Sequence, residues 1–192
     1  MAVSLVTAAT TEPVTIQDLK EQLRIDENTE DSYLGGLLKT ATRAVEKMSD
    51  RQLINATWRL SLDEFPCWDI RVPKPPLSSV SSITYVNSTG GSSTVASTDY
   101  AVDTYNEPGR ITPAYNATWP TGRLQNNAVT VTYVAGYGAS QNAVPDTYRH
   151  AIKMLAAHWH EHRESVLVGS ISKELEFTIT NLLGIESYGP YK

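Results

Sequence analysis

The segment 57–85, TWRLSLDEFPCWDIRVPKPPLSSVSSITY, constrains the fold more than any other part of the chain. It begins with apolar Trp58, Leu60 and Leu62 alternating with polar residues, and this period of two indicates a strand with one buried face. The prolines of segment 73–76 then separate later apolar runs, because proline has no N–H group to donate to a neighbouring strand. We therefore expect a meander of short antiparallel strands, in which no polar residue is placed for chemistry.

Further strand and turn signals follow in the middle of the chain. The glycine-rich segment 88–94 predicts a hairpin tip, and the turn residues 106–109 separate two short strands. The alternating apolar residues of segment 129–133 predict the last strand. We assign residues 53–143 to a small antiparallel β-domain inserted between two helical parts.

The N-terminal part, residues 1–52, predicts two helices. Thr15 and Asp18 have the spacing of a capping box before a short helix that ends near Arg24. The acidic run 26–31 predicts the first turn of the next helix, where carboxylates favour the helix dipole. The apolar stripe of that helix comprises Leu34, Leu37, Leu38, Ala41, Val45 and Met48.

A third amphipathic helix is expected within residues 144–168. Its stripe comprises Tyr148, Ile152, Leu155, Ala156 and Trp159. Packing this stripe against that of the second helix would build a helical core, so we expect an α+β fold. Residues 169–192 predict an extended docking tail, with one helical turn at Leu182 and Leu183 and an irregular aromatic end.

Composition limits the possible functions of this 192-residue chain. A formal net charge of −5 argues against wrapping nucleic acid, because cationic side chains supply most of that affinity. The chain contains no apolar run of about 18 residues that could span a membrane, and its first residues lack the basic start of an export signal. A single cysteine excludes an internal disulfide.

The histidine-rich segment 158–164 invites a metal-site interpretation. His158 and His162 are four residues apart on one helix face, and His150 lies two turns upstream. The order differs from HExxH, however, and the sequence offers no obvious third ligand. We favour a solvated or interfacial helix end, in which histidine complements the helix dipole, and we assign no metal ligand.

The sequence also lacks a convincing nucleophile or acid–base pair. Cys67 has no histidine near it in sequence, and we expect it to be a small buried apolar residue. Asp63 and Glu64 are adjacent, so in a strand their side chains would point to opposite faces. We therefore predict no catalytic residue, no cofactor and no enzymatic activity.

Several motifs occur in a fixed order along the chain. They are VEKMSDRQL (45–53), TWRLSLDEFP (57–66), PKPPLSSVSSITY (73–85), YAVD (100–103), YVAGYG (133–138) and HWHEHRE (158–164). This ordered set resembles the head–tail connector, or adaptor, proteins of tailed bacteriophages, and the similarity covers about residues 14–183. The chain departs from those relatives mainly in the tail, where ELEF (174–177) replaces a leucine–proline step.

The resemblance implies a structural protein of the virion, made in the host cytoplasm and located at the head–tail interface. Such proteins form a ring, commonly of twelve subunits, beneath the portal, where they extend the DNA channel and carry the neck or tail-completion protein. On this basis we expect the tail to bind the portal through Leu182, Leu183, Tyr188 and Tyr191. DNA would pass through the channel without specific binding.

Two alternatives of other classes stay open at this point. A metal-dependent hydrolase would use the histidine-rich helix end. A small ligand-binding β-domain would use the aromatic side chains of Trp58, Trp68 and Trp119.

Overall fold

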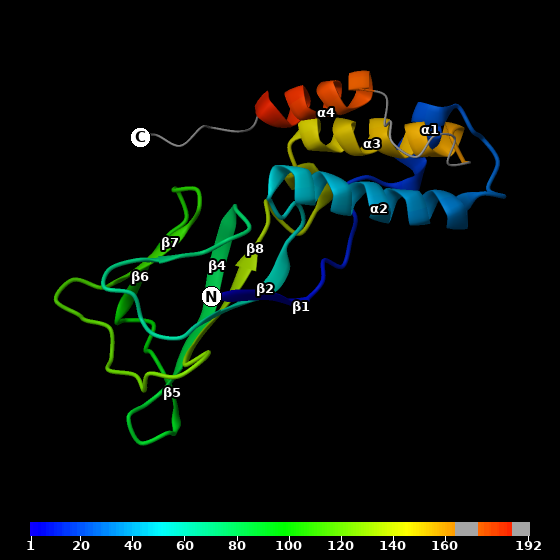
Figure 1. Cartoon of the computed structure of the whole chain (residues 1–192). Helices are drawn as coiled ribbons and strands as arrows, with labels where there is room; N and C mark the ends of the chain where they lie inside the picture. Colours follow the sequence, from blue (N-terminus) through cyan, green and yellow to red (C-terminus); the bar gives the residue numbers. More distant parts are fainter. Residues whose placement is uncertain (164–172, 186–192) are drawn as a thin grey trace. The chain divides into compact units, whose positions relative to one another are not determined.

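The computed structural model describes residues 1–163 and 173–185, which belong to two compact units (Figure 1). The β-unit contains Met1–Thr10 and Arg51–Ala139, and the helical unit contains Thr11–Asp50 and the chain from Ser140 onward. Helices together with antiparallel sheets confirm the expected α+β class. A search of the described helices finds none that is long and apolar enough to cross a membrane.

Helix α1 (Ile16–Leu23) begins at the predicted capping box. The Thr15 hydroxyl accepts a hydrogen bond from the Asp18 N–H at 2.9 Å, and the Asp18 carboxylate accepts one from the Thr15 N–H at 2.9 Å. The bond from the Thr15 N–H favours the charged carboxylate and so lowers the pKa of Asp18 below its ordinary value. The helix ends at Arg24, which has a left-handed φ of 58°.

Helices α2 (Asp31–Ser49) and α3 (Asp146–Glu161) pack against each other to form the core of the helical unit. The fully covered side chains are Leu34, Leu38, Ala41 and Val45 on α2 and Tyr148, Ala151, Ile152, Leu155 and Ala156 on α3. Two predicted stripe residues in the last turns differ, because Met48 is 47% exposed and Trp159 is half-buried. The spacing of apolar residues thus identified the buried face of each helix. It did not show at which turn that face becomes exposed.

The acidic run 26–31 contributes less to α2 than predicted. Only Asp31 lies inside the helix, and Glu30 is the residue that precedes it. The Nζ atom of buried Lys20 lies 2.5 Å from Asn28 Oδ1 and 2.5 Å from Asp31 Oδ1. Because a buried ammonium group requires such partners, these contacts fix the connection between α1 and α2.

Helix α4 (Lys173–Ile185) is longer than the single turn predicted around its two leucines. It contacts α3, and Figure 1 shows it in orange and red along that helix. Ile179 and Leu183 are buried, with exposed fractions of 1% and 8%. Their spacing of four residues places both on one helix face, a signal that the prediction overlooked.

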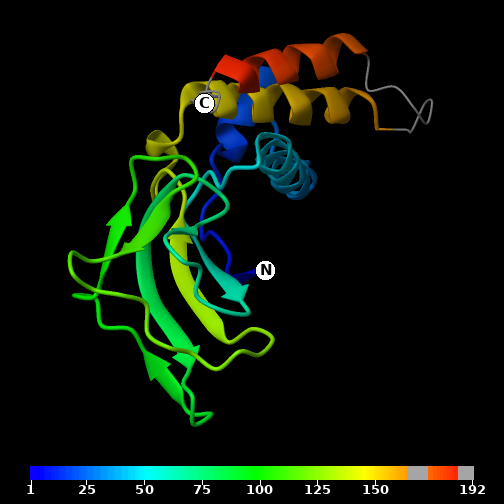
Figure 2. The ribbon, with the colours of Figure 1, turned by 60° about the vertical axis from the view of Figure 1, so that its left-hand side comes forward.

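The larger sheet of the β-unit has the strand order β1-β2-β8-β4-β5, and all neighbours are antiparallel. Its strands are β1 (Ala2–Thr7), β2 (Ala56–Leu62), β4 (Leu77–Val86), β5 (Ser92–Thr94) and β8 (Val129–Ala135). The predicted meander is wrong, because β8 lies between β2 and β4 (Figure 2). Four alternating residues of β8 are buried, and so apolar a strand is best covered at the centre of the sheet.

A second sheet has the order β3-β7-β6, with β3 (Ile70–Arg71), β7 (Arg110–Pro113) and β6 (Tyr100–Asp103). The pairing of β6 with β7 confirms the strands predicted on either side of the turn 106–109. Both sheets contribute to one apolar core, which includes Leu60 and Val131 from the larger sheet and Ile111 from the smaller one.

The motif residues that follow α2 hold the β-unit together. The Arg51 guanidinium donates to both carboxylate oxygens of Glu107, with 2.8 Å from Nη1 to Oε1, and also to the Tyr137 hydroxyl at 3.0 Å. The Gln52 N–H donates to the Pro75 carbonyl at 3.0 Å, and its side-chain oxygen accepts from Trp58 Nε1 at 3.1 Å. These motif positions are therefore used for packing and hydrogen bonding within the fold.

Candidate interaction surfaces

The histidine-rich end of α3 brings two imidazoles together. The ring centroids of His158 and His162 are 4.4 Å apart, and His162 Nδ1 lies 3.1 Å from the His158 carbonyl oxygen. Within residues 1–163 and 173–185, no group of three or more His, Cys, Asp or Glu side chains could hold a metal ion. The geometry thus gives the hydrolase alternative no support.

The other polar residues at this end of α3 bind Glu30 at the start of α2. The Glu30 carboxylate lies 2.9 Å from His160 Nε2 and 2.6 Å from Arg163 Nη2, and the Arg163 guanidinium stacks 4.9 Å from the Tyr33 ring centroid. The hydrogen bond from Arg163, supported by that from His160, lowers the pKa of Glu30 to about 2. This cluster joins the start of α2 to the end of α3.

Cys67 does not occupy the buried apolar position that we predicted. It is a free and exposed cysteine in the connection between β2 and β3, directly after Pro66. The prediction was wrong because the chain has already left the larger sheet, and an alternating pattern no longer determines which side chains are covered. Asp63 and Glu64 lie in the same connection and are exposed.

The three tryptophans proposed for ligand binding have different surroundings. Trp58 is half-buried on β2, whereas Trp68 is 78% exposed in the connection to β3. Trp119 stacks on Phe65 with ring centroids 5.1 Å apart, and its Nε1–H donates to the Trp68 carbonyl oxygen at 3.1 Å. The structure therefore brings Trp119 to the Trp68 backbone, while the indole of Trp58 binds Gln52.

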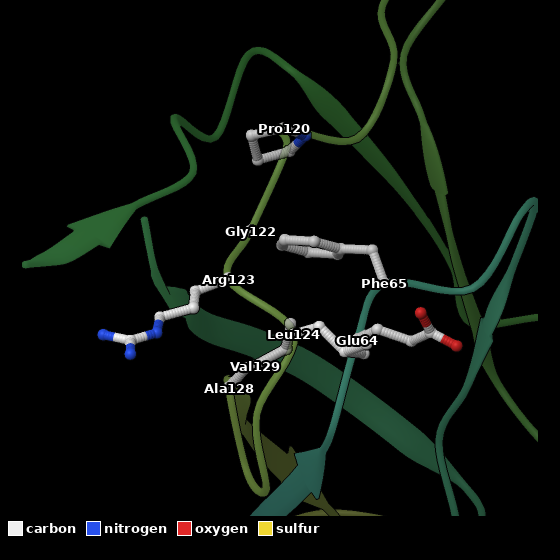
Figure 3. A pocket seen from close by; sticks show the side chains of 8 residues that line it. All are labelled: Glu64, Phe65, Pro120, Gly122, Arg123, Leu124, Ala128 and Val129. Atoms are coloured by element: carbon white, nitrogen blue, oxygen red, sulfur yellow. The ribbon is translucent and has the colours of Figure 1, made fainter. Parts of the chain in front are cut away.

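A small hollow adjoins Phe65 (Figure 3). Its volume is about 160 Å³, below the roughly 300 Å³ at which ligand pockets usually begin. Figure 3 shows the Phe65 ring pointing toward Gly122, while the charged ends of Glu64 and Arg123 point to opposite sides. Because the polar groups diverge, this hollow gives little support to a ligand-binding function.

The predicted hairpin tip is confirmed between β4 and β5, although residues 92–94 form strand β5 and shorten the tip. Asn87 Oδ1 accepts hydrogen bonds from the Thr89 N–H at 3.1 Å and the Gly91 N–H at 2.9 Å. The side chain of Asn87 thus shapes the projecting turn.

Strand β1 at the edge of the larger sheet is a surface that the sequence analysis did not predict. It pairs with β2 alone, and all six of its residues are exposed. Val3 and Leu5 pair with Leu60 and Trp58, so they lie on the face of the sheet that contributes to the core. Val3 is nevertheless 38% exposed and Leu5 50% exposed.

Two further apolar residues, beside Val3 and Leu5, are also exposed. Met1 is 74% exposed and Val6, at a register shift in the strand, is 46% exposed. A hollow of about 420 Å³ adjoins Met1, and it is also lined by apolar Leu62 and Ile70 and by acidic Asp63 and Glu64. We call Met1, Val3, Leu5 and Val6 the β1 edge patch.

The residues predicted to bind the portal are only partly described. Leu182 on α4 is half-buried, whereas Leu183 is buried in the unit. Tyr188 and Tyr191 lie outside the described residues. Of the four, Leu182 is thus the one whose described side chain is available to a partner.

In its described residues this α+β chain has no metal-binding cluster and leaves an apolar sheet edge uncovered. The family model for the Phage gp6-like head-tail connector protein matches residues 13–108, half of the 192 residues. The chain therefore belongs to the Phage gp6-like head–tail connector family, and it is a structural connector protein of the virion.

Solved structures share the whole fold. One similar chain is in the "Neck of empty GTA particle computed with C6 symmetry" and another is in the "Virion of native gene transfer agent (GTA) particle". In each case the TM-score is 0.78 and the identity is 23%, with 96% of this chain and 94% of that chain covered. A chain in the "Neck of native GTA particle computed with C12 symmetry" has the same identity and coverage and a TM-score of 0.72. A search of curated proteins finds no match.

Proposed function

We propose that this chain forms a closed ring beneath the portal, extends the DNA channel and carries the neck or tail-completion protein. Membership of the connector family supports this role, as does the fold shared with chains in particle necks that were computed with C6 and C12 symmetry. The work of such a ring is assembly and passage of DNA, without catalysis or a cofactor. The protein would be located in the host cytoplasm before it is incorporated into the virion.

The β1 edge patch is the observation that carries the proposal. An edge strand offers unpaired backbone groups, and here it also leaves Val3 and Leu5 uncovered on the core face of the sheet. A ring gives every subunit two neighbours through one repeated heterologous contact. We propose that the neighbouring copy of the chain in the ring covers this patch.

The charge of the chain suits a channel that must release DNA. With 16 basic and 21 acidic residues the net charge is −5, so the ring as a whole repels phosphates. The hairpin tip formed by residues 88–91 would point toward the channel or the tail side.

The contact with the portal is assigned to the C-terminal region. Leu182 would insert into the portal together with Tyr188 and Tyr191, and the two tyrosines would supply most of the free energy, since tyrosine is enriched among the residues that dominate such contacts. Leu183 would support them from within the unit by holding α4 on α3.

Mixing the purified protein with portal-bearing particles and imaging the vertices tests the ring. We expect wild-type protein to form a ring and Leu5→Asp to reduce ring occupancy at least tenfold, because the carboxylate would have to be buried in the contact. Ser4→Asp is the matched control, since its exposed side chain lies on the opposite face of the same strand. Equal rings from Leu5→Asp and wild type would reject the β1 contact.

A further inference from the structure

Helix α2 carries a line of exposed basic side chains from its middle to its C-terminal end. Lys39, Arg43 and Lys47 are spaced four residues apart, which places them along one side of the helix about 6 Å apart per step. All three are exposed, and they make no ion pair with any residue that the structure describes. We call these residues the α2 basic ridge.

The ridge carries more basic than acidic residues around it. Residues 32–45 contain no Asp or Glu, and Glu46 and Asp50 lie at its C-terminal end. A β-carbon added to Gly36 would meet no atom within 4 Å, so the helix is also open one turn before Lys39. The ridge is therefore accessible to a partner along its length.

An acidic surface lies at the other end of the same helical unit. Glu21 is exposed on α1, and Asp26 and Glu27 are exposed in the connection to α2. Arg24 is the one cation among residues 21–29 of the sequence. The neighbouring acids Glu30 and Asp31 already bind Arg163 and Lys20. We call Glu21, Asp26 and Glu27 the α1–α2 acidic patch.

The two surfaces cannot compensate each other within one copy. From Asp31 to Lys39, the first residue of the ridge, the helix rises by about 12 Å, whereas salt screens exposed charges over about 8 Å at physiological ionic strength. In a head-to-tail ring, however, the patch of one subunit can reach the ridge of the next. A repeated contact between two different surfaces is the kind that closes a ring.

We propose that the α2 basic ridge of one subunit docks on the α1–α2 acidic patch of the neighbouring copy. This inference rests on the proposed ring and specifies one of its contacts. The complementary charges would set the register and speed of assembly more than its total strength, because exposed ion pairs are individually weak. In this contact the neighbouring subunit also covers the ridge. Its cations are then not exposed in the channel, where they would retain the DNA.

Charge reversal with mixing tests this contact. One variant carries Lys39→Glu, Arg43→Glu and Lys47→Glu, and the other carries Glu21→Lys, Asp26→Lys and Glu27→Lys. Rings are counted by imaging on portal-bearing particles, and self-association is followed by sedimentation at low and high salt. Circular dichroism checks that each variant is folded.

We expect either variant alone to lose ring occupancy at least tenfold, and a 1:1 mixture to restore it, because every contact in an alternating ring again joins opposite charges. Wild-type assembly should weaken as salt rises. Normal rings from either variant alone, or no recovery in the mixture, would overturn the contact. If either variant formed normal rings that retained less DNA, the result would show that the ridge binds DNA instead of the neighbouring subunit. If the wild-type protein formed no ring, the proposed function itself would fail.

Discussion

Two glycines show how differently the fold uses the same residue. Gly136 follows β8 with a φ of +136°, and a β-carbon there would lie 2.5 Å from the Asn55 backbone nitrogen. Gly36, by contrast, lies inside α2 with open space around the position of its β-carbon. The first glycine is required by the backbone, and the second only lowers helix propensity.

Alanine substitutions should therefore have opposite effects on the free energy of unfolding. Gly136→Ala should destabilise the protein by about 3 kcal/mol, because it combines backbone strain with a clash against the main chain. Gly36→Ala should stabilise α2 by about 1 kcal/mol. Urea titration measures both changes, and a neutral effect of Gly136→Ala would contradict the close approach at this turn.

Glu30 should make the stability of the helical unit depend on pH. Its pKa is lowered to about 2 in the folded protein, chiefly by the hydrogen bond from Arg163, compared with an ordinary value of 4.5. A carboxyl group with a lowered folded pKa stabilises the fold above pH 4.5, and this contribution is lost as the pH falls toward 2. The wild-type urea midpoint should therefore drop more steeply over this range than that of Glu30→Gln.

The matched control for this experiment is Glu161→Gln, at the exposed end of α3. Its profile should run parallel to that of the wild type, because it leaves Arg163 and His160 bound to Glu30. Parallel profiles for wild type and Glu30→Gln would show that the cluster does not contribute to stability in this range.

Single residues were predictable where local chemistry decides their environment. The capping box at Thr15 and Asp18 was confirmed because both partners lie within one turn of chain. Cys67 and Met48 were wrong because their exposure depends on which other element covers them. The contacts of Glu30 with His160 and Arg163 join residues about 130 positions apart, and sequence periodicity contains no signal for them.

At the scale of elements, helices and strands with a clear period were found, and so was the packing of the second helix against the third, whereas the order of strands in the larger sheet was not. The second and third helices were confirmed, and so was the alternating strand β8. The order of strands was wrong because β8, at the end of the β-unit, pairs with strands that precede it by up to 79 residues, as in the pair Ala56 and Ala135. Strand β1 was not predicted from the sequence.

Helix α4 provides a test of the proposed portal contact. Leu182→Asp should weaken binding to portal particles at least tenfold, because a half-buried leucine at a contact becomes a charge that must lose its water. Neighbouring Asn181→Asp, which is exposed on the same helix, is the matched control. Leu183 is less informative, since its burial makes loss of folding a competing explanation.

Binding is measured by co-sedimentation with portal particles, with helix content followed by circular dichroism. Unchanged binding by folded Leu182→Asp would exclude this leucine from the contact. Equal losses for both variants would mean that added charge alone repels the portal.

At the scale of the whole molecule, a single copy of the chain leaves several surfaces uncovered. The β1 edge patch and the two charged surfaces of the helical unit are uncovered among the described residues. The sequence could predict a structural role because its motifs serve packing and turns. It could not show that these surfaces stay uncovered, since the exposure of a residue depends on which other elements pack over it.

The copy number at a portal vertex tests the central claim most directly. Particles bearing the portal are incubated with the protein, washed and imaged without imposed symmetry. We predict one closed ring of identical copies around the portal axis, with twelvefold symmetry like the C12 symmetry of the similar neck structure. A single copy at each vertex, an open chain of copies or a bare portal would contradict the account.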